Sequence, residues 1–66
     1  MYPKGEVLWV EYYNSRGELI FGVTSKDARD FYYLYENVGG KMVKRGRDKD
    51  PSVLADRFDV KRKMFA

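Results

Sequence analysis

The sequence predicts an α+β fold in which a small antiparallel β-meander packs against a C-terminal helix. Apolar and polar residues alternate over 7–13 and again over 18–23, and a short turn-forming segment separates the two runs. A segment that begins with proline and carries apolar residues at helical spacing follows Asp50. With 66 residues, the chain is expected to form one small domain, 1–66, that buries about 60% of its unfolded surface.

The first two strands, 7–13 and 18–23, predict a hairpin with one apolar face. That face carries Leu8, Val10 and Tyr12 from the first strand and Leu19, Phe21 and Val23 from the second. A four-residue loop over 14–17 pairs them as Leu8–Val23, Val10–Phe21 and Tyr12–Leu19. A three-residue loop is less favoured, because it sets Glu11 against Phe21. In the favoured register Trp9 and Tyr13 lie on the other face.

The segment from Ser25 to Val38 allows two interpretations. High β-propensity over 31–36 predicts a third strand, which a turn over 37–40 connects to a fourth strand over 41–46. The alternative is a helix over 25–37, which would give the order ββαβα. The regular spacing of four strand starts favours the meander.

The final helix is predicted over 51–58. Asp50 is the N-cap, Pro51 takes the first helical position, and Leu54 and Phe58 form an apolar pair one turn apart. The apolar spacing could carry this helix on to Phe65. The expected core comprises Leu8, Val10, Tyr12, Leu19, Phe21, Val23, Leu54 and Phe58, with Phe31, Tyr35 and Met42.

Composition narrows the function more by exclusion than by motif. The chain has no Cys and no His, which argues against thiolate metal sites and against His-based catalysis. No close carboxylate pair comes with the rest of a catalytic or metal site, so we expect no enzyme activity, no cofactor and no metal. No apolar run approaches membrane-spanning length and no signal peptide is evident, so we expect no membrane association and a cytoplasmic location.

Charge and aromatic residues suggest a binding module. Residues 1–40 carry four basic and six acidic groups, whereas residues 41–66 carry nine basic and four acidic groups. Aromatic rings beside cations on a flat sheet suit stacking on bases and neutralisation of phosphates. The sequence therefore predicts a nucleic-acid-binding sheet face. Its candidate residues are Trp9, Tyr13, Tyr32, Lys41, Lys44, Arg45 and Arg47.

Two further hypotheses share these residues. The same Trp, Tyr and Arg side chains would suit a protein interface, such as that of a phage or mobile-element accessory protein that regulates a host protein. An exposed patch at Trp9, Tyr13 and Ile20 would also suit a homodimer.

Part of the chain resembles a known family. In residues 33–54 the segment Tyr33-Leu34-Tyr35-Glu36-Asn37-Val38-Gly39-Gly40-Lys41 leads into a basic strand and a helix that starts at proline. This pattern is similar to part of the small lysine-rich chromatin proteins of archaea. The resemblance implies a meander closed by a C-terminal helix and duplex DNA bound on a sheet face. The N-terminal half departs from that family, because its first strand is aromatic and acidic.

Overall fold

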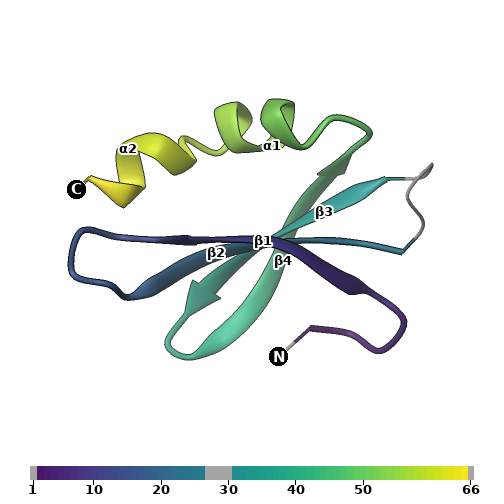
Figure 1. The fold of residues 1–66 in the computed structure, drawn as a ribbon, viewed down its shortest axis with the longest axis horizontal. Helices are drawn as coiled ribbons and strands as arrows, with labels where there is room; N and C mark the ends of the chain where they lie inside the picture. Colours follow the sequence, from purple (N-terminus) through teal and green to yellow (C-terminus); the bar gives the residue numbers. More distant parts are fainter. Residues whose placement is uncertain (1, 27–30, 66) are drawn as a thin grey trace.

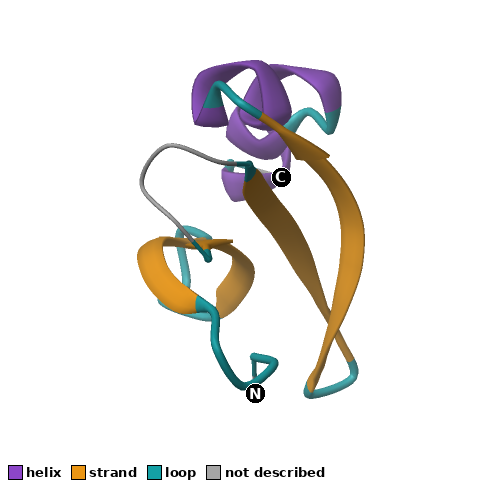
Figure 2. Cartoon of the chain, turned by 90° about the vertical axis from the view of Figure 1, so that its right-hand side faces the viewer, coloured by secondary structure: helices purple, strands orange, loops and turns teal. Residues whose placement is uncertain are grey.

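The computed structural model describes residues 2–26 and 31–65. Four strands form one antiparallel sheet in chain order: β1 (Val7–Tyr13), β2 (Leu19–Ser25), β3 (Tyr32–Val38) and β4 (Lys41–Asp48). Two short helices follow, α1 (Pro51–Arg57) and α2 (Val60–Met64). Both helices cover one face of the twisted sheet, and the N-terminus lies on the opposite side (Figure 1, Figure 2).

The predicted α+β meander is confirmed, and the strands run at most two residues past their predicted ends. The alternative helix over 25–37 is wrong for residues 32–37, which belong to β3; residues 27–30 lie outside the described part of the chain. β3 pairs with β2 on one side and β4 on the other, so its backbone groups are satisfied by two ladders. The aromatic and β-branched residues within β3 favour this extended conformation.

The first hairpin closes with a shorter loop than the favoured prediction. The amide of Asn14 donates to the carbonyl of Glu18, and the amide of Gly17 donates to the carbonyl of Asn14, each at 2.9 Å. Gly17 has a φ of 81°, which glycine adopts without steric cost. The ladder then shifts between Tyr12 and Tyr13, so Val10 pairs with Val23 instead of Phe21. A slip of two residues keeps Val10 and Tyr12 on their predicted face, but Ile20, predicted on the other face, packs against the core, and Leu19, predicted in the core, is not part of it.

A second shift in β1 changes the predicted faces. Leu8 pairs with Thr24 and Val10 pairs with Val23, so two residues of β1 are matched by one residue of β2. Trp9 is therefore an extra, bulged residue. Leu8 now pairs with Thr24 and is 45% exposed, so its predicted place in the core is wrong. The Trp9 ring packs edge-on against Tyr32, with ring centroids 5.2 Å apart.

The second hairpin has a two-residue turn. Gly39 and Gly40 have φ values of 59° and 90°, the signs that a type I′ turn requires at both central positions. Val38 therefore pairs with Lys41, and Glu36 pairs with Val43 instead of Lys41 as predicted. A further shift opposite Leu34 and Tyr35 leaves Arg45 as the extra residue of β4.

The core lies between the sheet and the helices. We call this side of the sheet the helix face. The fully buried residues of the core are Phe21, Val23, Leu34, Leu54 and Val60. Each buried side chain of this kind contributes roughly 1.5–3 kcal/mol to folding. Phe58 packs on Gly46, where a Cβ atom would lie 3.0 Å from the ring, so the absence of a side chain makes room for the helix.

The C-terminal segment forms two helices, α1 and α2, and does not continue as one. The Asp50 carboxylate accepts from the amide of Ser52 at 2.9 Å and caps α1, as predicted. The backbone of Asp59 is left-handed, with a φ of 53°, and this turn brings Val60 into the core. The carbonyl of Met64 accepts from the amide of Ser15 at 3.1 Å, which ties α2 to the first hairpin.

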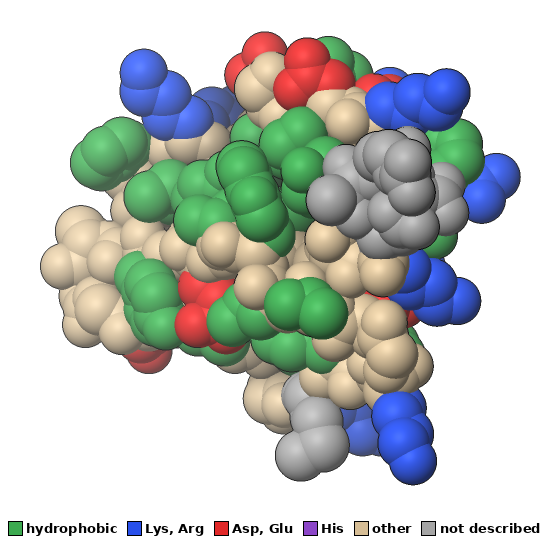
Figure 3. Space-filling model, turned by 45° about the vertical axis from the view of Figure 1, so that its right-hand side comes forward, with side chains coloured by type: hydrophobic (Ala, Val, Ile, Leu, Met, Phe, Trp, Pro, Cys, Tyr) green, Lys and Arg blue, Asp and Glu red, His purple; other side chains and the backbone are tan. Residues whose placement is uncertain are grey.

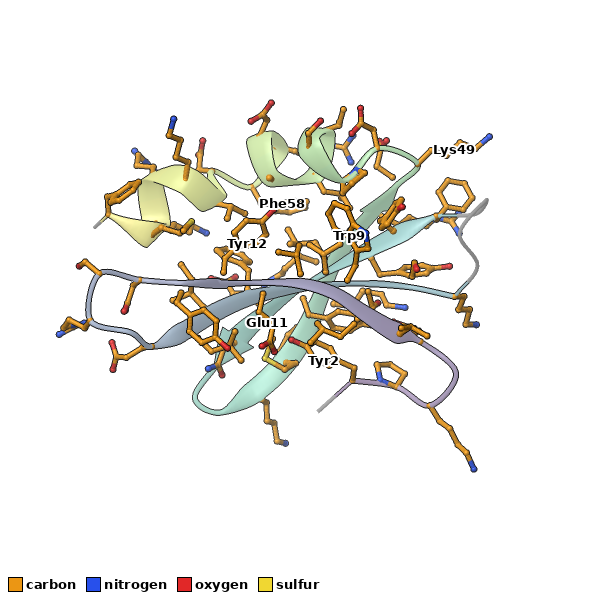
Figure 4. The ribbon with its side chains drawn as sticks, viewed as in Figure 1. Tyr2, Trp9, Glu11, Tyr12, Lys49 and Phe58 are labelled. Carbon is orange, nitrogen blue, oxygen red and sulfur yellow. The ribbon has the colours of Figure 1, made fainter. Side chains whose placement is uncertain are left out.

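Residues 2–6, here called the arm, cross the opposite side of the sheet, which we call the arm face. The amide of Glu6 donates to the carbonyl of Pro3 at 3.3 Å, and Gly5 has a φ of 91° within this turn. Figure 4 shows Tyr2 and Glu11 on the arm face and Trp9, Tyr12 and Phe58 on the helix face. The helices therefore pack on one face of the sheet and the arm packs on the other.

Candidate functional site

The arm face brings aromatic rings from β3 and the residue before it beside cations from β4 and the residue after it. Alternation along β3 places Leu34 on the helix face and Tyr33 and Tyr35 on the arm face. Tyr33 pairs with Arg47 and Tyr35 pairs with Lys44, so these cations project on the same side as the rings. We call this set the cation–ring row, and it comprises Phe31, Tyr33, Lys44, Arg47 and Lys49.

Each ring of the row lies against a cation. The Lys44 ammonium lies 4.3 Å from the centroid of the Tyr33 ring. The guanidinium carbon of Arg47 lies 4.8 Å from the centroid of the Phe31 ring, and the Lys49 ammonium lies 5.9 Å from the same centroid. These distances are in the range of cation–π attraction, which holds each cation beside its ring.

The row is accessible to a ligand. Phe31 and Tyr33 are half-buried, and the three cations are exposed. Neither Arg47 nor Lys49 has a carboxylate within 4.0 Å among the residues that the structure describes. Figure 4 shows Lys49 pointing away from the molecule where β4 meets α1. The row therefore presents positive charge and ring surface together.

A nearly buried carboxylate adjoins the row. The Glu6 side chain is only 3% exposed. Its carboxylate accepts hydrogen bonds from the hydroxyls of Thr24 and Tyr35, both at 2.6 Å, and lies 3.6 Å from the Lys44 ammonium. Burial by itself would raise the pKa of Glu6, but the hydroxyl hydrogen bonds and the Lys44 charge outweigh it and lower the pKa. Glu6 is therefore held as an anion.

Tyr2 fixes the other end of the arm. Its ring occupies the space that a Cβ at Gly22 would need and packs edge-on against Tyr35, with ring centroids 5.5 Å apart. The Tyr2 hydroxyl donates to the Glu11 carboxylate at 3.0 Å. Burial, and then the hydrogen bond and charge of the neighbouring carboxylate, raise the pKa of Tyr2 well above its usual value, and the same causes act on Tyr35. Both phenols therefore stay protonated as donors.

The predicted site residues divide between the two faces of the sheet. Lys44 and Arg47 belong to the cation–ring row. Trp9 and Tyr32 lie on the helix face, because Tyr32 packs against the core and Trp9 contacts Tyr32. The predicted placement of Trp9 on one face with Tyr13 is therefore wrong, and the bulge in β1 is the cause.

The other three predicted residues have separate surroundings. The Arg45 side chain pairs with Glu36 at 2.9 Å, and Lys63 of α2 lies 3.7 Å from the same carboxylate. The Tyr13 hydroxyl donates to Glu11 at 2.8 Å, near the arm, and this hydrogen bond raises the pKa of Tyr13. Lys41 is exposed beside the glycine turn.

The sequence prediction missed Phe31, Tyr33 and Lys49 as site residues. Once the two-residue turn is recognised, the register follows: Tyr35 faces Lys44. The glycine pair at 39 and 40 was the available signal, because it is typical of type I′ hairpins. The bulge at Arg45 has no such marker, and without it Tyr33 could not be matched to Arg47.

A second accessible surface lies along the first strand. Val7, Leu8 and Trp9 are consecutive apolar residues of β1 with exposures of 66%, 45% and 55%. Figure 3 shows apolar side chains gathered between the helices and the sheet, with Lys and Arg around the margin. We call residues 7–9 the β1 flank.

The chain matches no protein-family model, no curated protein and no solved structure. Within residues 2–26 and 31–65, no group of three or more metal-ligating side chains comes together. In the same part of the chain, neither helix has the length and apolar character needed to cross a membrane.

Proposed function

We propose that this protein is a non-enzymatic binding module that holds unpaired nucleic acid on its cation–ring row. The observation that carries the proposal is the row of half-buried rings of β3 and its flank beside exposed cations of β4 and its flank, with the Arg47 guanidinium carbon 4.8 Å from the centroid of the Phe31 ring. Stacking on aromatic rings does not depend on base identity, and Lys and Arg neutralise phosphates. Unpaired bases are favoured over duplex because only an unpaired base offers its whole face to a ring.

Charge along the chain supports the same surface. Three of the nine basic residues in the C-terminal third, Lys44, Arg47 and Lys49, belong to the row. Among the described residues Lys44 pairs with Glu6, and Arg45, Arg57, Arg62 and Lys63 pair with other carboxylates, whereas Arg47 and Lys49 have no carboxylate within 4.0 Å. Two cations of the row, Arg47 and Lys49, therefore remain available to a ligand, and Lys44 joins them when its pairing with Glu6 is broken.

Fluorescence anisotropy with a labelled single strand of about 12 nucleotides tests the proposal. Affinity should fall with salt, with a log–log slope of about −0.7 for each phosphate contact. Phe31→Ala should cost about 1–3 kcal/mol of binding, and Arg47→Ala should weaken binding and make the slope less negative by about 0.7. An unlabelled duplex serves as competitor and should compete poorly.

Two variants provide matched controls. Arg16→Ala removes the same charge from the first hairpin loop, and Phe65→Ala removes a ring that is 72% exposed at the end of the chain. Both should bind like the wild type. Equal losses in Arg47→Ala and Arg16→Ala, or binding that is independent of salt, would refute the proposal.

A protein partner is the second candidate, and the β1 flank favours it. Trp9 is the only tryptophan and is 55% exposed, and Trp is a frequent anchor of protein interfaces. Its emission distinguishes the two candidates, because Trp9 lies on the helix face and the cation–ring row lies on the arm face. An oligonucleotide on the row should leave Trp9 emission unchanged, whereas a protein on the flank should alter it.

A further inference from the structure

The three groups around the Glu6 carboxylate form a ready anion site. Thr24 and Tyr35 each donate a hydroxyl hydrogen bond at 2.6 Å, and Lys44 adds a positive charge at 3.6 Å. We call Thr24, Tyr35 and Lys44 the Glu6 socket. Hydroxyl and ammonium donors that converge on one negative group are also what a phosphate oxygen requires.

The socket and its occupant belong to different parts of the fold. Thr24 is in β2, Tyr35 in β3 and Lys44 in β4, so the paired strands fix the donors. Glu6 belongs to the arm and precedes the first strand. If the arm moved, the donors would stay in place. Because Thr24 is fully buried, its hydroxyl would then need another acceptor.

The arm is attached to the sheet by few side chains. Tyr2 and Glu6 make the contacts described above, whereas Pro3, Lys4 and Gly5 are exposed. Gly5 sits at a φ of 91° just before Glu6, a position where glycine lets the chain change direction at low cost. The carboxylate can therefore leave the socket through rotation around a short turn, without breaking the β1–β2 ladder.

The socket is continuous with the cation–ring row. The Lys44 ammonium that faces Glu6 also lies 4.3 Å from the centroid of the Tyr33 ring, the nearest ring of the row. A phosphate bound in the socket would therefore be next to the rings that stack on bases. While Glu6 is in the socket, it neutralises the one cation that both surfaces share.

We infer that the Glu6 socket is a phosphate site, which the Glu6 carboxylate occupies as a placeholder until a ligand displaces the arm. The site takes a phosphate group, from free phosphate or from a nucleic-acid backbone. In the second case the inference rests on the proposed function. The observed affinity of such a site falls in proportion to the fraction of molecules in which the arm is open.

The test compares Glu6→Ala with Glu18→Ala. Both changes remove one negative charge, but Glu18 is an exposed residue of the first hairpin loop. Inorganic phosphate is titrated into each isotope-labelled variant and followed by NMR. Glu6→Ala should bind phosphate at least about tenfold more tightly than Glu18→Ala, with the largest shifts at Thr24, Tyr35 and Lys44. Adding Lys44→Ala to Glu6→Ala should abolish the gain.

The labelled single strand provides the second arm of the test. In Glu6→Ala the salt dependence of binding should steepen by about 0.7, because Lys44 gains a phosphate contact, while Glu18→Ala keeps the wild-type slope. Phosphate binding at the socket without oligonucleotide binding would refute the proposed function and leave the socket as a site for free phosphate. Equal phosphate affinity in Glu6→Ala and Glu18→Ala would refute the inference, whatever the oligonucleotide does.

A variant that loosens the arm covers the case in which Glu6→Ala does not fold. Tyr2→Ala removes the contacts with Gly22 and Tyr35 but keeps the carboxylate. It should bind phosphate more tightly than the wild type, with shifts at the same three residues. No gain in folded Tyr2→Ala would contradict the inference.

Discussion

At the residue scale, the arm depends on a position that lacks a side chain. Gly22 lies in the middle of β2, fully buried, and the Tyr2 ring fills the space above its Cα. The Cβ atom of any other residue at position 22 would collide with the Tyr2 side chain. Glycine inside a strand weakens the strand by itself, so the close approach of a ring is the physical reason for its presence here.

Gly22→Ala should displace Tyr2 and destabilise the protein by roughly 1–3 kcal/mol, the usual cost of overpacking. Chemical denaturation measures this loss. In Tyr2→Ala, which has already lost the ring, the same Gly22→Ala change should cost much less, because the colliding group is gone. A double-mutant cycle with no coupling between the two positions would contradict this account.

At the scale of elements, the faces of the strands were predictable where the ladder runs without a bulge, and the registers were not. The period of two along 7–13 and 18–23 correctly placed Val10, Tyr12, Phe21 and Val23 on one face. A strand register depends on turn length, and both turns are shorter than the favoured prediction. The bulges at Trp9 and Arg45 leave no trace in composition, so the side on which Trp9 lies could not be derived from the sequence.

The helices were partly predictable from the sequence. Asp50 and Pro51 mark the start of α1 by local chemistry, and the structure confirms both roles. The break at Asp59 comes from packing, because it lets Val60 reach the core.

The candidate site was also predictable only in part. The mixture of rings and cations was predicted, but only Lys44 and Arg47 of the predicted residues lie in the cation–ring row.

Asp50→Ala should remove the N-cap of α1 and lower the free energy of unfolding by about 1 kcal/mol. The Asp50 carboxylate accepts from both the amide and the hydroxyl of Ser52, at 2.9 Å and 2.7 Å, and alanine satisfies neither donor. Asp50→Asn keeps an acceptor and should recover most of the loss. Urea unfolding of the two variants makes the comparison, and equal losses would contradict the capping role.

At the scale of the whole molecule, the sheet holds an apolar core on one face and a hydrogen-bonded polar cluster on the other. The helix face is sealed by Leu54 and Val60, whereas the arm face is covered in part by Tyr2 and Glu6. The first kind of burial does not depend on pH. The second depends on the ionisation of Glu6, so acid should weaken the attachment of the arm.

Stability should therefore fall as the solution is acidified. The folded protein lowers the pKa of Glu6 below its ordinary 4.5, so this carboxylate stabilises the fold above that pH. The contribution is lost as the pH falls through the lower, folded pKa. At pH 7, Glu6→Gln should be less stable than the wild type by roughly 2 kcal/mol, the scale of hydrogen bonds to a charged group.

Urea unfolding at pH 7 and at pH 3 measures this effect. The gap between wild type and Glu6→Gln should narrow at the lower pH, because pH 3 lies below the ordinary pKa of a glutamate, so the carboxyl of the unfolded wild-type chain is protonated and folding has to release that proton. Glu18→Gln, an exposed control, should track the wild type at both pH values. A gap that stays constant would show that Glu6 acts only through packing.

Both outermost strands of the sheet contain an extra residue, Trp9 in β1 and Arg45 in β4. Such insertions bend a strand and disturb the straight row of amide and carbonyl groups on which another chain could align. The bulges at Trp9 and Arg45 therefore work against edge-to-edge pairing of the meander with a second chain at either margin.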